Sequence, residues 1–353
     1  MSLPSPDYRQ LEDFTLHDLE CVELLLRGGT VVDWPRLVMS SREEAEELVR
    51  VHELDLERTD DLKYIASVRD EAIDYLKRNF DFPVPKPIRQ ASLIDLLLLA
   101  SGRGHRQVCA CSILKVMHVI HHLRSQELRS SLPLSDQRMF GLVEEKIYRV
   151  VGSMLYGGLP IIELVGGRKH RDGQYTKLLA KQDTIGARIY DKIRFRMVTR
   201  HRDDIFPVLN HLMRRLFPVT YVMPHQSTNT LFRVRSYTEA HEHLRSLRDR
   251  LQLPVDQEDE PVRRDNEFSD PGYQVVHFVA DLPVRIDDFL KEEGITPKNP
   301  GPVIFSLMEL QIVDREAETS NEQGPASHAA YKERQRQAVE RRLKLGMARR
   351  RSG

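Results

Sequence analysis

The stretch from Met308 to Asp314 reads Met-Glu-Leu-Gln-Ile-Val-Asp and alternates apolar with polar side chains. A period of two predicts a half-buried β-strand whose apolar side chains share one face. Glu309 and Gln311 share the other face, so this strand offers a carboxylate and an amide to whatever lies over the sheet. Taken alone, the pattern is also typical of an ordinary edge strand.

A second group of polar side chains follows in the segment from Glu322 to Lys332, which reads Glu-Gln-Gly-Pro-Ala-Ser-His-Ala-Ala-Tyr-Lys. This segment predicts a loop that runs into a helix. A strand carboxylate close to Glu, His, Tyr and Lys side chains suits a site that handles metal and phosphate. The structural alternative is a solvated loop.

Two upstream segments open further apolar strands: Gly272–His277 (Gly-Tyr-Gln-Val-Val-His) and Asp191–Arg196 (Asp-Lys-Ile-Arg-Phe-Arg). Together and in this order, the segments resemble the synthetase domain of the RelA/SpoT family. That domain carries an Asp-x-x-x-x-Arg strand start, a Gly-Tyr-x-x-x-His strand, a Glu-x-Gln-Ile strand and a Glu-x-Gly-x-Ala-x-His-x-x-Tyr-Lys tail. The resemblance covers residues 166–332, a little under half of the chain.

Enzymes of that family make guanosine tetra- and pentaphosphate by moving pyrophosphate from ATP to the ribose 3′-hydroxyl of GDP or GTP. The resemblance therefore implies a pyrophosphokinase that uses Mg²⁺ and has ATP and GDP or GTP as substrates. It assigns Asp191 and Glu309 to catalysis and to Mg²⁺, with Glu309 also helping to remove the 3′-hydroxyl proton. The alternatives are a helix or strand cap for Asp191 and a solvated sheet face for Glu309.

The resemblance also implies two sets of binding residues. The ATP-binding set is Lys169, Lys177 and Arg196, with the Arg196 guanidinium stacked on adenine. The acceptor-binding set is Tyr273, His277, Gln311, His328 and Lys332, with Tyr273 stacked on guanine and His277 on the same strand face. The structural alternatives are a charged surface loop for the two ATP-site lysines and core packing for Tyr273 and His277.

Four residues at three places depart from the family's pattern. Gly167 replaces an Arg of the adenine site, Gly173 replaces a Ser, and Val313-Asp314 replaces Arg-Thr, which makes the acceptor pocket less cationic. Two alternatives therefore stay open. The acceptor is an adenine nucleotide or the transfer-RNA 3′ end, or the core is degenerate and binds a nucleotide or a partner without catalysis.

The pattern along the chain predicts an α+β fold, with a helical N-terminal region followed by a small mixed β-sheet core flanked by helices, like a nucleotidyltransferase. We expect a regulatory or structural helical domain over residues 1–150, the synthetase-like domain over 151–335 and a basic tail over 336–353. The helices expected in the first domain begin after Thr15, at Ser41 with Glu44, and at Asp60, Ser92 and Val108. Within this domain His118, His121 and His122 have the helical spacing of a metal site. We favour packed or solvated histidines, because no Asp lies beside them.

The second domain alternates strands and helices. Strands are expected over Ile193–Thr199, Val219–Met223, Leu231–Arg235, Gly272–Leu282 and Val303–Val313, and helices over Asp203–Phe217 and Tyr237–Leu251. Residues 256–270 are polar without periodicity and predict a loop.

Composition predicts a globular, cytoplasmic protein, with 40% hydrophobic and 30% charged residues. No N-terminal apolar run indicates export, and the longest apolar run, Leu96–Ala100, is too short to span a membrane. Three cysteines are too few for a disulfide framework. Lys and Arg together number 53, as do Asp and Glu. We therefore do not favour nucleic acid as a partner of the basic tail, although clustered cations can bind phosphate backbones. A homo-oligomer is compatible with the sequence.

Overall fold

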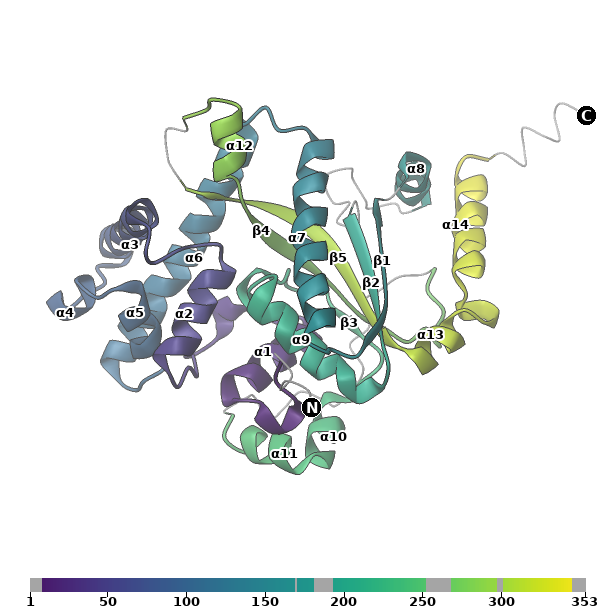
Figure 1. Cartoon of the computed structure of the whole chain (residues 1–353), viewed down its shortest axis with the longest axis horizontal. Coiled ribbons are helices and arrows are strands. Elements are labelled where there is room, and N and C mark those ends of the chain that lie inside the picture. The colour runs from purple at the N-terminus through teal and green to yellow at the C-terminus, as the bar shows by residue number, and fades with distance from the viewer. Residues whose placement is uncertain (1–7, 169, 181–192, 252–267, 297–300, 345–353) are drawn as a thin grey trace, which may run out of the picture.

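A computed structural model describes residues 8–168, 170–180, 193–251, 268–296 and 301–344 (Figure 1). Helices come first and a mixed sheet follows, so the predicted α+β fold class is confirmed. The N-terminal helices are α1 (Leu16–Arg27), α2 (Arg42–Val51), α3 (Thr59–Phe80), α4 (Lys86–Arg89), α5 (Leu93–Ala100), α6 (His105–Ser131) and α7 (Asp136–Tyr156).

The five-stranded sheet has the order β1-β2-β5-β4-β3. Its strands are β1 (Ile161–Arg168), β2 (Ile193–Thr199), β3 (Thr228–Asn229), β4 (Val276–Arg285) and β5 (Val303–Asp314). Strands β2 and β5 run parallel at the centre, and the other neighbours are antiparallel. The predicted mixed sheet is therefore present, with the Glu309 strand in its middle.

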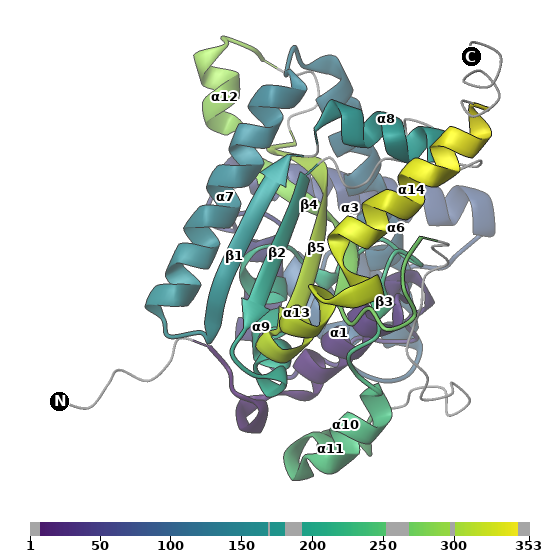
Figure 2. The ribbon, with the colours of Figure 1, turned by 90° about the vertical axis from the view of Figure 1, so that its right-hand side faces the viewer.

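The remaining helices cover the sheet from two sides. They are α8 (Arg171–Ala180), α9 (Ile205–Arg215), α10 (Val234–Ala240), α11 (Glu242–Arg248), α12 (Asp287–Glu292), α13 (Arg315–Asn321) and α14 (His328–Arg342). Helices α7 and α9 lie on one side of the sheet, and α8, α13 and α14 lie on the other (Figures 1 and 2). The second group therefore borders the face on which the polar strand residues are expected.

Side-chain caps explain where two N-terminal helices begin. The Thr15 hydroxyl accepts a hydrogen bond from the backbone N–H of Asp18, and the Asp18 carboxylate accepts one from the backbone N–H of Thr15. The Ser41 hydroxyl accepts from the backbone N–H of Glu44 at the start of α2. These contacts satisfy N–H groups that have no partner inside the helix. The predicted helix starts after Thr15 and at Ser41 are confirmed.

Two of the predicted short strands are wrong. Val219–Met223 contains a 3₁₀ turn over Val219–Tyr221 and contributes only a single bridge, from Val222 to Ala280. In the other segment, Leu231–Arg235, the Asn229 side chain accepts from the Phe232 N–H and donates to the Phe232 carbonyl. Such local bonds compete with strand pairing, and β3 is confined to Thr228–Asn229.

The predicted helix over Tyr237–Leu251 is broken at His241, where the backbone is extended. The bend turns α11 towards the N-terminal segment, where the His243 ring bonds the Phe14 carbonyl at 2.9 Å. Leu244 and Leu247 of α11 are buried in the same core as α1. Tertiary packing therefore decides this break, and a helical periodicity cannot reveal it.

The hydrophobic side chains form two clusters that do not divide at residue 150. The larger cluster joins α1, the end of α6, and α7 to the sheet and its helices. The smaller cluster lies within residues 39–117 and also includes Val303 of β5. The three-part division of the chain stays a prediction, but the first helix shares its core with the sheet. Among the described residues no helix is both long and apolar enough to cross a membrane.

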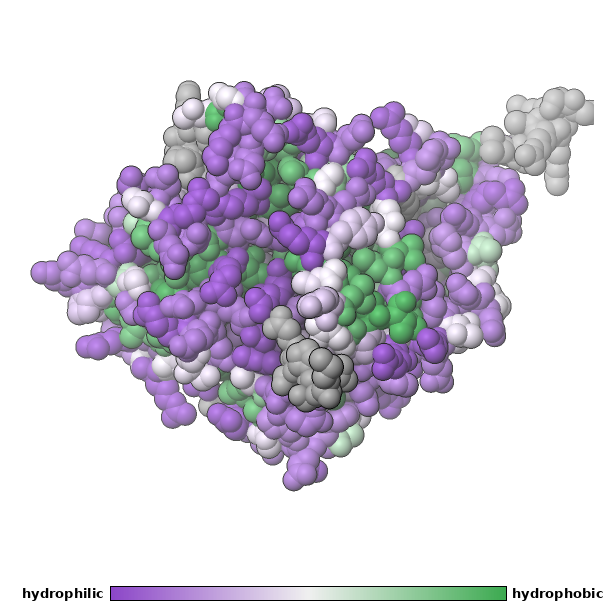
Figure 3. All heavy atoms as spheres, viewed as in Figure 1, coloured by the Kyte–Doolittle hydropathy of each residue, from purple (hydrophilic) through white to green (hydrophobic). Residues whose placement is uncertain are grey.

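Strand β1 forms an edge of the sheet and exposes apolar side chains. Ile162 and Val165 of β1 are exposed, as are Leu155 and Tyr156 at the end of α7. Figure 3 shows an apolar area over this edge. Exposed apolar edges are typical of surfaces that pair with another chain. The homo-oligomer that the sequence allows stays a prediction.

Gly166 of β1 is required by the packing of the sheet on α7. A Cβ atom at this position would lie 2.6 Å from Cδ1 of Phe195, closer still to Cε1, and 3.1 Å from the Tyr148 hydroxyl. Because Phe195 is fully buried, its ring has little room to move. We expect Gly166→Ala to lower the free energy of unfolding by about 1–3 kcal/mol in urea titration.

Gly167→Ala is the matched control, because a Cβ atom there meets nothing within 4 Å. Its effect should stay within about 0.5 kcal/mol. Equal losses in the two variants would mean that backbone conformation, and not the Phe195 contact, requires glycine in β1.

The three histidines of α6 pack against aromatic rings. The His121 ring lies 5.6 Å from the Tyr64 ring and 5.6 Å from the Phe305 ring, and His118 lies 4.8 Å from the Tyr221 ring. His122 Nε2 lies 2.6 Å from an oxygen of Asp281. Within the described ranges no group of three His, Cys, Asp or Glu side chains is arranged to hold a metal ion. The contacts that the structure gives to these histidines are therefore aromatic rings and, for His122, the Asp281 carboxylate.

Burial makes His118 and His121 sensitive to acid. Burial lowers the pKa of His118 to about 4 and that of His121 to about 3, with further lowering by the neighbouring histidines. In the unfolded chain His118 and His121 take up protons near pH 6.5, whereas in the folded protein they stay neutral to lower pH. Stability should therefore be fully present above pH 6.5 and fall as the pH approaches 4. We expect a loss of about 1–2 kcal/mol per histidine between pH 7 and 5.

Urea titration at pH 7 and 5, on the parent and on His118→Gln, measures this loss. Because Gln does not titrate, the variant should lose less stability than the parent over the same pH range. Identical pH dependence in the two proteins would contradict a buried, neutral His118.

Candidate active site on the polar face of the sheet

Strand register gathers polar side chains on one face of the sheet. Glu309 on β5 pairs with Arg194 on β2, and Gln311 pairs with both Arg196 on β2 and His277 on β4. Directly paired residues of neighbouring strands point to the same face. The intervening residues Phe195, Leu310 and Phe278 are fully buried in the opposite, apolar face. A polar face of five side chains therefore lies over the three central strands.

Glu309 is held at the centre of this face and is only 9% exposed. Gln311 Nε2 donates to Oε1 of Glu309 at 2.8 Å, and His277 Nε2 lies 3.4 Å from the same oxygen. Both neighbours sit on strands that pair along their length, so the carboxylate is fixed by rigid backbone. The alternative of a solvated sheet face is excluded by this burial.

Arg196 lies on this face and forms an ion pair with Glu318 of α13. Both side chains are partly buried, and burial raises the pKa of Glu318 while the Arg196 charge opposes the rise. Sequence analysis missed Glu318, since only tertiary folding brings α13 over β2. It also missed Arg194, although the alternation Arg194-x-Arg196 on a predicted strand places both on one face. The predicted stacking of Arg196 on adenine stays a prediction.

Tyr273 approaches the same face from a turn, because β4 begins only at Val276. The expectation that Tyr273 and His277 share one strand is therefore wrong. Burial raises the pKa of the Tyr273 hydroxyl; Glu318 and Glu309 raise it further, whereas Arg196 and Arg194 lower it. These electrostatic contacts place the hydroxyl within the field of the polar face.

Hydrogen bonds to neighbouring backbone fix this turn. The Tyr273 carbonyl accepts from the Thr230 hydroxyl at 2.9 Å. Next to it, the buried Asn321 side chain accepts from the Gln274 N–H at 2.9 Å and donates to the Gln274 carbonyl at 2.6 Å. Asn321 ends α13, so the helix that carries Glu318 also anchors the turn that carries Tyr273. One short helix thereby positions two residues of the site.

Asp314 has a different role from the one expected. This buried residue at the end of β5 accepts from the Ala317 N–H at 2.7 Å and thereby caps α13. Arg202 Nε donates to its other oxygen at 2.8 Å, which compensates the charge. Both oxygens of the Asp314 carboxylate are bonded within the protein. The structure therefore does not support the expectation that this carboxylate makes the acceptor pocket less cationic.

Three predicted binding residues lie on the helices that border the polar face. Lys177 is half-buried on α8, and His328 and Lys332 are exposed one turn apart at the start of α14. The Ser327 hydroxyl caps α14, and Arg342 of α14 donates to the Leu179 carbonyl of α8 at 3.0 Å. Figure 2 shows α14 crossing in front of the sheet with α8 beside it. These residues border the face, and their roles stay predictions.

The remaining predicted residues have separate positions. Asp191 and Lys169 lie outside the described residues. Gly167 is exposed on β1 opposite Arg194, so an arginine is present on the neighbouring strand although it is absent at position 167. Gly173 lies in α8. The predicted loop over residues 256–270 falls largely outside the described residues.

Magnesium is compatible with the donor set on the described part of this face. Mg²⁺ binds proteins through one or two carboxylates and completes its shell with phosphate and water. Glu309 provides one such carboxylate, which is buried and accepts a hydrogen bond from the Gln311 amide. The positive side chains Arg194 and Arg196 lie on the adjacent strand, where they can offset phosphate charge.

No family model matches the chain, and no curated protein matches its sequence. Solved structures similar to it include the small alarmone synthetase 1 from Bacillus subtilis, at 17% identity and a TM-score of 0.32, covering 61% of this chain and 92% of that one. The same protein bound to its product pppGpp matches at 18% identity and 0.31, covering 64% and 96%.

A GTP pyrophosphokinase family protein from Streptococcus pneumoniae matches at 14% identity and a TM-score of 0.29, covering 59% of this chain and 84% of that one. The three structures are of two proteins, both of the kind that the sequence motifs resemble. Identities and TM-scores this low assign neither an activity nor a substrate to the present chain.

Proposed function

We propose that this chain transfers pyrophosphate from ATP to the ribose 3′-hydroxyl of a guanine nucleotide, GDP or GTP. One observation carries the proposal: a buried carboxylate and two arginines share one face of the sheet, and their charges act on the hydroxyl of Tyr273 in the turn before β4. Glu309, Arg194, Arg196 and Tyr273 also fall within three of the four motifs that resemble the RelA/SpoT synthetases. The geometry thus joins residues that the motifs name separately.

The reaction forms a bond between the acceptor's 3′-oxygen and the β-phosphorus of ATP, and it breaks the bond from that phosphorus to the bridging oxygen of AMP. AMP leaves, and the 3′-hydroxyl loses its proton. Bound Mg²⁺ would offset the charge of the phosphate oxygens. Glu309, together with Asp191, would hold this ion, and Glu309 would accept the proton from the 3′-hydroxyl.

Cationic and aromatic residues have complementary tasks in this proposal. Arg194 and Arg196 lie beside Glu309 and would hold the ATP phosphates and adenine, with Lys169 and Lys177 completing the set. Tyr273 would stack on the guanine and Gln311 and His277 would position Glu309 and the acceptor. His328 and Lys332, on the helix in front of the sheet, would bind acceptor phosphate.

Binding of a non-cleavable ATP analogue tests the nucleotide site without requiring turnover. We expect α,β-methylene-ATP to bind the parent in the presence of Mg²⁺ and to bind Arg196→Ala about tenfold or more weakly, since charged hydrogen bonds contribute about 1.5–3 kcal/mol. Arg315→Ala is the control, because Arg315 is exposed on α13. Calorimetric titration that gives equal affinities for all three proteins would remove Arg196 from the site.

The arginines of α14 argue against a transfer-RNA acceptor. Arg334 donates to the carbonyls of Phe268 and Pro325, Arg336 pairs with Glu333 and Glu340, and Arg342 donates to Leu179. These arginines make contacts within the protein. Phosphate backbones are bound by cations that release counterions, and the two glutamates beside Arg336 reduce its contribution to such binding.

Deleting residues 343–353, which keeps Arg342 and its bond to α8, should leave transfer to GDP or GTP nearly unchanged. A mononucleotide acceptor needs no guiding tail, whereas an RNA end would lose phosphate contacts. Each lost contact would lower the slope of log affinity against log salt by about 0.7–0.9. Transfer rates and transfer-RNA binding at several salt concentrations measure both. Tight, steeply salt-dependent RNA binding that disappears with the tail would favour the RNA acceptor instead.

A further inference from the structure

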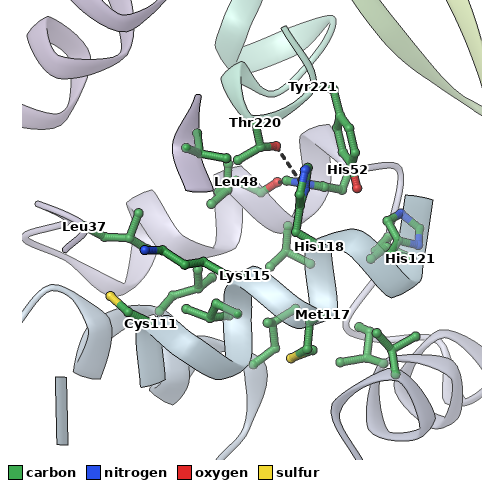
Figure 4. A pocket seen from close by; sticks show the side chains of 18 of the residues that line it. Leu37, Leu48, His52, Cys111, Lys115, Met117, His118, His121, Thr220 and Tyr221 are labelled. Carbon is green, nitrogen blue, oxygen red and sulfur yellow. Dashed lines mark hydrogen bonds between the residues drawn. The ribbon is translucent and has the colours of Figure 1, made fainter. Parts of the chain in front are cut away.

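A cavity of about 150 Å³ lies between the N-terminal helices and the sheet domain. Its lining includes Leu48 of α2, His52 directly after α2, Met117 and His121 of α6, and Tyr221 of the 3₁₀ turn over Val219–Tyr221. Figure 4 shows these side chains around the space. The cavity lies apart from the polar face that carries Glu309, because none of the residues of that face lines it.

Most of the cavity wall is apolar. Leu97, Ile65, Val68 and Leu114 line it, and all four belong to or pack against the smaller hydrophobic cluster. An apolar cavity of this volume can stay free of water and bind a molecule the size of benzene. The wall therefore favours an apolar ring or a short branched chain as the body of a ligand.

One end of the cavity is polar, and hydrogen bonds there are incomplete. The Tyr221 hydroxyl and Nε2 of His121 are buried, and neither has a hydrogen-bond partner among the described residues. His121 Nδ1 is engaged by the Tyr64 hydroxyl at 2.8 Å, and His52 Nε2 lies 3.3 Å from the Thr220 hydroxyl. Figure 4 shows Tyr221, His52, His118 and His121 gathered at this end, with Cys111 and Lys115 at the other.

Leaving buried polar atoms without a partner is costly for a folded protein. Each unsatisfied group costs about 1–3 kcal/mol. Both Tyr221 and His121 line this cavity, and their ring centroids lie 6.3 Å apart. A hydroxyl group has one proton and two lone pairs, so it can donate to one of these atoms and accept from the other. A ligand hydroxyl can therefore bond both the Tyr221 hydroxyl and Nε2 of His121, whether or not that nitrogen carries the proton.

We propose that this cavity is a binding site for a small, uncharged molecule with an apolar ring or chain and one hydroxyl group, which bonds Tyr221 and His121. The polar end contains only groups that burial keeps neutral: burial lowers the pKa of His52 and His118 to about 4 and that of His121 to about 3, and raises that of Tyr221. Lys115 lies at the opposite end (Figure 4), and burying an anionic group among neutral side chains is costly.

Binding at this place joins the two parts of the protein. Helices α2, α5 and α6 supply one wall, and the turn with Thr220 and Tyr221 leads from α9 of the sheet domain. A ligand that binds only the folded state raises its stability by mass action. The bound molecule would therefore stabilise the contact between the N-terminal helices and the sheet, whether or not the protein transfers pyrophosphate.

Three aromatic probes of similar shape separate the contribution of the hydroxyl group to binding from that of the apolar ring. 4-Methylphenol carries a hydroxyl, 1,4-dimethylbenzene replaces it by a methyl group, and 4-methylbenzoate replaces it by a carboxylate. We expect 4-methylphenol to raise the melting temperature of the full chain in a saturable way and to bind about two- to tenfold more tightly than 1,4-dimethylbenzene, the ratio expected for one net hydrogen bond. 4-Methylbenzoate should bind more weakly than both.

Two variants and a control test the position of the site. Tyr221→Phe keeps the shape and should remove most of the preference for 4-methylphenol over 1,4-dimethylbenzene, whereas Tyr148→Phe, at the exposed face of α7, should keep it. Leu114→Trp should fill the cavity and abolish binding of both probes. Absence of saturable binding to the parent, a preference that persists in Tyr221→Phe, or tighter binding of 4-methylbenzoate would each overturn the proposal.

Discussion

Glu309→Gln should lower the rate of pyrophosphate transfer by about 10³-fold or more while leaving the fold intact. The substitution replaces a carboxylate by an amide of the same shape, which removes the negative charge that holds Mg²⁺ and accepts the proton. Metal-assisted charge stabilisation contributes several kcal/mol to a transition state, and each 1.4 kcal/mol corresponds to a factor of ten in rate. Turnover of ATP with GDP at saturating Mg²⁺ measures the loss.

The geometry of Glu309 makes this variant a fair test. The Gln311 amide donates to Oε1 of Glu309, and the oxygen of an introduced Gln can accept the same hydrogen bond. Its melting temperature should therefore stay within a few degrees of the parent value. Glu316→Gln, on the exposed surface of α13, is the matched control and should keep full activity. Activity of Glu309→Gln within a few-fold of the parent would remove this residue from the mechanism.

Asp191→Asn should cause a loss of similar size. This expectation rests on the sequence motif, since Asp191 lies outside the described residues.

Tyr273→Ala should raise the KM for the acceptor about 5- to 150-fold and leave the KM for ATP nearly unchanged. Stacking of a base on an aromatic ring contributes about 1–3 kcal/mol, which gives this range. Only the acceptor would lose its stacking partner, because the turn before β4 carries the ring, whereas the described residues expected to bind ATP lie on β2 and α8. Initial rates with each substrate varied in turn separate the two KM values.

Tyr273→Phe is the control for this prediction. It keeps the ring and removes only the hydroxyl, so its acceptor KM should stay within about threefold of the parent. Equal rises in both KM values for Tyr273→Ala, or a large fall in its melting temperature, would mean that the ring contributes packing rather than recognition.

The features that local sequence determines were predictable. β2 has the expected bounds, Ile193–Thr199, because its β-branched and aromatic residues alternate with arginines. Glu309 and Gln311 share a face because the side-chain period of a strand is two. Thr15 and Ser41 begin helices because their hydroxyls cap backbone N–H groups.

Features that depend on distant contacts were not predictable. Arg196 could not be matched with Glu318, since this ion pair depends on how α13 folds back over β2. Asp314 looked like part of a binding pocket, but its partners are the start of the next helix and Arg202, far earlier in the chain. Tyr273 lies in a turn whose backbone groups bond side chains: the Thr230 hydroxyl donates to the Tyr273 carbonyl, and the Asn321 side chain accepts from the Gln274 N–H. In a strand, a neighbouring strand would provide such bonds. In each case a tertiary partner outweighs the local pattern.

The identity of the products tests the central claim most directly. The parent protein is incubated with Mg²⁺, ATP labelled at its γ-phosphate, and in turn GDP, GTP, AMP, ADP or transfer RNA. We predict that the label moves to GDP or GTP, that one AMP forms for each labelled product, and that the new group can be removed as pyrophosphate from the ribose 3′ position. Formation of ADP in place of AMP, label only in free phosphate, or label in adenine nucleotides or RNA but not in guanine nucleotides would contradict the account.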